Sequence, residues 1–188
     1  MGTRNLTAVM VDGQYKIAQY GQWDGYPSGQ GRTALQFCRE HLTTSDGIAA
    51  VRGSISRVRF YDKGRDTEDS MESFRKFWTR DNGAKILGLV RSAPSDLAEI
   101  VLTNSIDFAG DSLFCEWAYV VDLDRGTLEV YRGFNEEPHT GQRFSDAKRD
   151  GDKYYPVRHV ASFTFGTLPD DDEFCRVCDP REEDVDAA

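Results

Sequence analysis

The sequence has few of the residues from which common catalytic and metal sites are built. It contains three histidines and four cysteines in 188 residues. No apolar run approaches the roughly 20 residues that a membrane-spanning helix needs. No signal peptide precedes the first predicted strand. We therefore expect no membrane association, a cytoplasmic location and reduced thiols.

Negative charge is abundant, but it is unevenly distributed. The net charge is -9, and residues 169–188 account for -7 of it, which leaves -2 for residues 1–168. A nearly neutral body lacks the carboxylate-covered surface of a DNA mimic, and no Lys/Arg stripe indicates nucleic-acid binding. The composition predicts one folded domain over residues 1–168 and an acidic, mobile tail over residues 169–188, with no nucleic-acid partner.

Two stretches show the alternation of a β-hairpin. Asn5–Val11 and Gln14–Tyr20 alternate on either side of Asp12-Gly13, which is a strong turn signal. Leu6, Ala8 and Met10 fall on one face of the first strand. A second hairpin is predicted from Trp117–Leu123 and Thr127–Tyr131, and a final strand from Val157–Phe165.

Helical periodicity is clearest over Thr33–Leu42, and Thr43–Gly47 is expected to break that helix. Further helices are predicted from Asp66 to the Asp81-Asn82-Gly83 stop and over Ser95–Leu102. Ser54–Asp62 fits a strand or a helix, Ile86–Val90 is unassigned, and Arg132–Gly151 is expected to be a long loop. The element order predicts a single α+β domain with a mainly antiparallel sheet, two hairpins and flanking helices.

The loop Gly21–Gly31, GQWDGYPSGQG, is the most distinctive stretch of the chain. Trp23 and Tyr26 in a glycine-rich loop indicate either a structured turn that covers the core or a surface for a ligand. The glycines stand just before Arg32 and the predicted helix, a junction at which backbone N–H groups can hold an anion. The glycine spacing matches neither the P-loop nor the dinucleotide fingerprint.

Antiparallel pairing of the first hairpin should bring the start of the chain beside this loop. Asp24 is the leading candidate for general acid/base catalysis, since neighbouring rings can desolvate a carboxylate and raise its pKa. The alternatives are an Asx-type turn and a structural clamp with Arg4. Glu116, before the second hairpin, is the candidate for a second working carboxylate. The residues predicted to bind a ligand are Thr3, Arg4, Gln22, Trp23, Tyr26 and Arg32.

A threonine close to the start of a hairpin also gives a layout like that of the N-terminal-nucleophile hydrolases. Removal of Met1 would leave Gly2 as the terminus, and glycine carries no nucleophile. The sequence therefore resembles these hydrolases in the order of its elements but lacks their N-terminal nucleophile.

Four residues are weak candidates for a zinc site, and otherwise no cofactor is predicted. Cys38 and His41 stand at helical spacing, and Cys175 and Cys178 form a lone pair of possible ligands. Cys38 also fits the apolar stripe of its helix, and the second pair fits a short turn that docks the tail.

The M-x-T-R start and the WDGYP-type loop resemble a group of uncharacterised proteins from bacteriophages, bacteria and fungi. The resemblance covers about the first forty residues and extends to Glu116–Asp124; it implies a location for function but no reaction.

We carry two hypotheses. The first is a small cytosolic binding or accessory protein, phage-encoded and acting on a host component, with Gly21–Gly31 recognising a protein or a small anionic ligand. The second is a hydrolase-like enzyme that uses Asp24.

Overall fold

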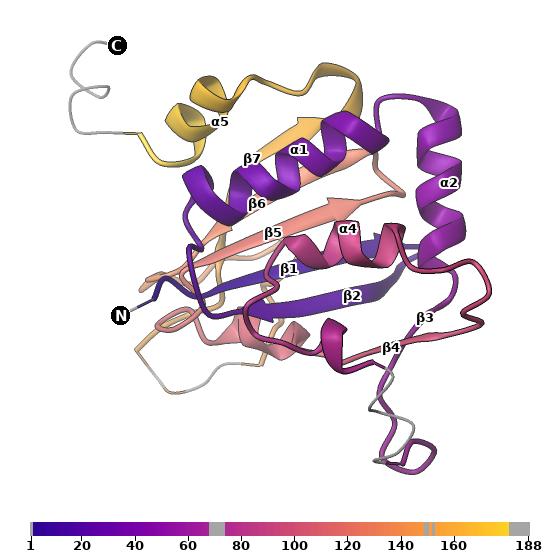
Figure 1. Cartoon of the computed structure of the whole chain (residues 1–188). Coiled ribbons are helices and arrows are strands. Elements are labelled where there is room, and N and C mark those ends of the chain that lie inside the picture. Colours follow the sequence, from indigo (N-terminus) through magenta and orange to yellow (C-terminus); the bar gives the residue numbers. More distant parts are fainter. Residues whose placement is uncertain (1, 68–73, 149–150, 152, 181–188) are drawn as a thin grey trace.

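The computed structural model describes residues 2–67, 74–148, 151 and 153–180, and its centre is a five-stranded sheet (Figure 1). The strand order is β2-β1-β5-β6-β7. The strands are β1 (Asn5–Val11), β2 (Gln14–Gly21), β5 (Trp117–Asp122), β6 (Thr127–Arg132) and β7 (Arg158–Thr164). A separate two-stranded sheet contains β3 (Val58–Phe60) and β4 (Ile100–Leu102).

Both predicted hairpins and the predicted final strand are confirmed. β1 pairs antiparallel with β2, β5 with β6, and β6 with β7. The β1–β2 turn places Asp12 and Gly13 at φ values of 52° and 71°, the left-handed conformation that Asp-Gly favours. The central pair β1–β5 is parallel, which joins the two hairpins into one sheet. The fold is therefore α+β with a mainly antiparallel sheet.

The described helices cover one face of this sheet (Figure 1). They are α1 (Arg32–His41), α2 (Ser45–Ile55), α4 (Lys85–Arg91) and α5 (Asp171–Cys178). The prediction of α1 is confirmed. The expected break after it is shorter than Thr43–Gly47, because the Thr44 hydroxyl accepts a hydrogen bond from Gly47 N and caps α2. The unassigned run Ile86–Val90 lies within α4.

The predicted helix over Ser95–Leu102 is wrong. Its last three residues form β4, and Ile100 pairs in parallel with Val58 of β3. The three β4 side chains are all buried, so β-branched packing outweighs the helix-start signal. The helix predicted from Asp66 lies partly outside the described residues. Asp66 itself forms a 2.6 Å ion pair with Arg59, which lowers the pKa of Asp66 to about 2.

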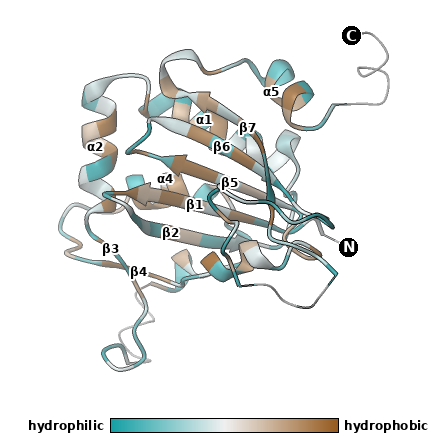
Figure 2. Ribbon diagram, turned by 180° about the vertical axis from the view of Figure 1, so that it is seen from behind, coloured by the Kyte–Doolittle hydropathy of each residue, from teal (hydrophilic) through white to brown (hydrophobic). Residues whose placement is uncertain are grey.

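Each face of the sheet carries its own apolar core. On the helical face, Val9 and Val11 pack with residues of the helices, while Leu6 and Ala8 pack on the opposite face. The alternation predicted for the first strand is thus confirmed for these side chains. The opposite face is covered by a 3-10 turn over Ile106–Gly110, by the connecting residues 133–148 and by Val157 (Figure 2).

The acidic segment expected to be a mobile tail contains α5. The Asp170 carboxylate caps this helix by accepting from Glu173 N at 2.8 Å, and Asp171 pairs with Arg39 at 2.6 Å. Phe174 and Cys178 are buried against the core. Three of the acidic residues, Asp171, Asp172 and Glu173, therefore lie in the first turn of a docked helix, and residues 181–188 lie outside the described residues. None of the described helices has the length and apolar character needed to cross a membrane.

Candidate functional site

The start of the chain lies beside the Gly21–Gly31 loop, as the hairpin pairing requires. Asn5 pairs with Gly21, and Gly25 N donates to Thr3 O at 2.9 Å. Thr3 is buried, so it supports the loop through its carbonyl and presents little side chain to a ligand.

Two buried side chains hold the loop backbone in place. The hydroxyl of Tyr119, on β5, donates to Gly25 O at 2.8 Å. Gln30 donates from Nε2 to Trp23 O at 3.3 Å, and its Oε1 accepts from Ala84 N at 2.7 Å. These bonds tie the loop to the central sheet and to the start of α4. Breaking hydrogen bonds between buried polar groups costs free energy, so these bonds hold the loop backbone in one conformation.

Sequence analysis missed Tyr119 and Gln30. Tyr119 appeared only as one aromatic residue of a predicted strand, and Gln30 as one polar residue among glycines. Their partners lie 94 and 54 positions away, at Gly25 and Ala84 respectively. No local pattern carries that information.

Two large rings project from this fixed backbone. Trp23 and Tyr26 are each 49% exposed. Trp23 Nε1 donates to Asp81 Oδ1 at 3.0 Å, and its ring packs so closely against Gly2 that a Cβ there would stand 2.2 Å from Cε3. After Tyr26, a π-helical turn over Pro27–Gly31 leads directly into α1. The rings are thus surface features and do not cover the core.

Asp24 occupies the strained centre of the loop. Its φ is 57°, in the left-handed region, and a Cβ on Gly29 would lie 2.4 Å from Asp24 Cγ. Asp24 is exposed, so Trp23 and Tyr26 do not enclose its carboxylate as sequence analysis expected. Within the described residues, the Asp24 side chain forms neither the Asx-type hydrogen bond nor the ion pair with Arg4.

Two hydrogen bonds that involve the main chain connect Arg4 and Glu116. Arg4 N donates to Glu116 Oε1 at 3.1 Å, and Glu116 N donates to Arg4 O at 3.2 Å. The half-buried carboxylate of Glu116 therefore joins β1 to β5 at the start of both strands. The guanidinium of Arg4 lies over the ring of Phe114, 4.4 Å from its centroid.

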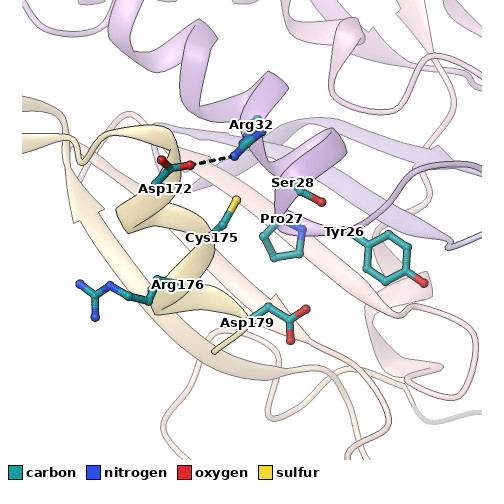
Figure 3. A pocket seen from close by; sticks show the side chains of 8 residues that line it. All are labelled: Tyr26, Pro27, Ser28, Arg32, Asp172, Cys175, Arg176 and Asp179. Atoms are coloured by element: carbon teal, nitrogen blue, oxygen red, sulfur yellow. Dashed lines mark hydrogen bonds and ion pairs between the residues drawn. The ribbon is translucent and has the colours of Figure 1, made fainter. Parts of the chain in front are cut away.

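A pocket of about 500 Å³ separates the loop from α5 (Figure 3). Its charged lining is balanced, with two arginines and two aspartates, and Arg32 and Asp172 form a 3.4 Å ion pair across it. Such a lining suits a neutral or mixed-charge group better than an isolated anion. The lining residues are Tyr26, Pro27, Ser28, Arg32, Asp172, Cys175, Arg176 and Asp179.

The four weak zinc candidates are not gathered into a metal site in the described part of the chain. Cys38 lies in the core, where burial raises the pKa of its thiol. The ring of His41 packs edge-on against Phe37 at 5.0 Å. Burial, with the charges of Cys175 and Asp179, raises the pKa of Cys178 to about 12. Across the described part of the chain, no three His, Cys, Asp or Glu side chains are grouped as a metal site.

Comparison with protein-family models, curated proteins and solved structures gives no match for this chain. The resemblance in the M-x-T-R start and the WDGYP-type loop therefore stays a prediction.

Proposed function

We propose that this chain is a binding protein that acts in the cytoplasm and recognises a protein partner through the Gly21–Gly31 loop. The supporting observation is the pair of half-exposed rings, Trp23 and Tyr26, on a backbone held by Tyr119 and Gln30. A phage origin and a host component as the partner remain part of this proposal.

The physical argument concerns the entropy of binding. Tryptophan and tyrosine dominate the energetics of many protein interfaces, because they bury a large area with few rotatable bonds. A flexible loop would have to be ordered on association, which weakens affinity. Here the backbone bonds that order the loop are already present in the free protein.

The hydrolase-like alternative has weaker support. Asp24 is exposed and Glu116 is bonded to Arg4 N, so the two predicted catalytic carboxylates occupy different surroundings. A desolvated acid or base of the kind that such catalysis favours is not formed by Asp24 in this arrangement.

The test compares a loop variant with a matched surface variant. W23A/Y26A removes both rings, whereas Tyr61→Ala removes a ring that is 41% exposed at the end of β3. Each protein is used to capture partners from a lysate of the source cells, and the best-enriched partner is purified and titrated by calorimetry. We expect W23A/Y26A to weaken binding about tenfold or more.

Tyr61→Ala should bind like the wild type, and all three proteins should have similar melting temperatures. Equal affinity of the wild type and W23A/Y26A would contradict the proposal. So would equal losses in the loop variant and in Tyr61→Ala.

A further inference from the structure

A second polar surface lies at the end of β2, on the sheet face opposite the helices. Leu6 of the opposite core pairs with Tyr20, so the alternation of the strands places Arg4, Tyr20 and Gln22 on that same face. The Tyr20 hydroxyl donates to Gln22 Oε1 at 2.6 Å. Gln22 N donates to Arg80 O at 2.8 Å, which brings Arg80 to the edge of this surface.

The two arginines of this surface lack anionic partners. Within the described residues, neither the Arg4 nor the Arg80 guanidinium forms an ion pair or a hydrogen bond. Arg4 Nε is buried without a hydrogen-bond acceptor. Other arginines of the chain, such as Arg39 and Arg59, pair with aspartates at 2.6 Å.

Both guanidinium groups act electrostatically on the Tyr20 hydroxyl. Burial raises the pKa of Tyr20, and the positive charges of Arg4 and Arg80 act in the opposite direction. Glu116, the residue before β5, already accepts from Arg4 N through its Oε1. A buried donor without an acceptor is unusual in a folded protein, and a bound anion would supply the acceptor that Arg4 Nε lacks.

We propose that Arg4 and Arg80 form an anion-binding site, with Gln22 as a third donor, for a carboxylate or phosphate group. The planar guanidinium matches both groups in geometry, and charge-assisted hydrogen bonds to it are about twice as strong as neutral ones. The Phe114 ring holds the Arg4 fork in place by stacking. Since the Tyr20 hydroxyl occupies Gln22 Oε1, the Gln22 amide N–H groups remain as donors.

This site is separate from the Tyr26 pocket and does not depend on the proposed protein partner. It adjoins Trp23, because Asp81, the neighbour of Arg80, accepts from Trp23 Nε1. An anionic group bound there would sit beside the tryptophan.

The test is an NMR titration of the full chain labelled with 15N. Inorganic phosphate and acetate are added separately at constant ionic strength, and the amide and arginine Nε resonances are followed. We expect saturable shifts at Gln22, Arg80 and Arg4 Nε. Arg4→Gln should weaken binding about tenfold or more, as loss of a charge-assisted bond predicts. Arg4→Lys should recover part of the affinity, since it restores charge without the fork.

The control is Arg158→Gln, which removes an exposed arginine at the start of β7 and should leave the titration unchanged. Tighter binding of phosphate than of acetate would assign a phosphate group, and the reverse order a carboxylate. Shifts that do not saturate, or that are the same in Arg4→Gln, would overturn the proposal. If Arg4→Gln fails to fold, the exposed Arg80→Gln variant serves the same comparison.

Discussion

Two connecting segments lie against the central sheet, and they are fixed by opposite kinds of chemistry. The Gly21–Gly31 loop is held by neutral groups, chiefly the Tyr119 hydroxyl and the Gln30 amide. The segment 133–148, on the other side of the sheet, is held by buried charges.

Arg143 is the centre of the charged anchor. It donates to both carboxylate oxygens of Glu129, at 2.7 and 2.9 Å, and also bonds to Asp122. The side chain of Arg143 is 8% exposed, that of Glu129 4% and that of Asp122 3%. The Tyr131 hydroxyl completes the group by donating to Glu129.

The difference shows what each segment is suited for. A buried ionic group holds a segment in one position but makes it depend on every member of the group. Neutral anchors fix the loop backbone without consuming its charged side chains, so Asp24 and the two rings stay at the surface. The charged anchor supports structure, and the neutral anchor supports recognition.

The largest expected effect comes from removing the charged anchor. Arg143→Met leaves Glu129 and Asp122 without their buried cationic partner, and loss of one member of a buried pair costs about 3–5 kcal/mol. Urea denaturation of the variant measures the free energy of unfolding. The control is Arg125→Met, because Arg125 is 71% exposed although it contacts the same acids. A similar loss in both variants would remove the distinction between the two anchors.

A smaller effect is expected from the neutral anchor. Tyr119→Phe leaves Gly25 O without its buried donor, at a cost of about 1–3 kcal/mol. The loop should respond more than the rest of the sheet, so the Gly25 amide should exchange faster with solvent. Hydrogen exchange followed by NMR measures this, with β6 amides as internal reference. Unchanged Gly25 protection would contradict a role of the Tyr119 hydroxyl in holding the loop.

Asp24 gives an effect of backbone origin. Asp24→Ala must hold alanine at a left-handed φ and should cost about 1–2 kcal/mol. Asp24→Asn, which tolerates this conformation, should be nearly neutral. Equal losses in the two variants, measured by thermal unfolding, would mean that the carboxylate itself stabilises the loop.

The smallest expected effect is the acid response of the charged anchor. Burial raises the pKa of Glu129, but bonds from Arg143 and Tyr131 outweigh it, so the pKa lies below its ordinary 4.5. The stabilisation is therefore complete above pH 4.5 and is lost as the pH falls through the lower, folded-state pKa. The stability difference between the wild type and Glu129→Gln, measured from pH 7 downward, should shrink only in that acid range. A stability difference that already shrinks above pH 4.5 would contradict the lowered pKa of Glu129.

The hairpins and α1 were predictable because their signals are local. Asp12-Gly13 sets a turn, and its pairing also places Thr3 beside the loop. The parallel β3–β4 pair and the docking of α5 depend on contacts between distant segments, which periodicity does not encode. For the same reason a long polar stretch gave no sign that Arg143 would be buried. At the site, the exposed rings were visible in the sequence, but the groups that anchor them were not.

The central place of β1 has a consequence for synthesis of the chain. Its parallel neighbour β5 is far ahead, since Arg4 and Glu116 are 112 positions apart. The first hairpin therefore leaves the ribosome long before β5 is available to pair with β1. Closure of so large a loop also slows folding. During that interval the nascent chain presents an open strand to chaperones and to other chains.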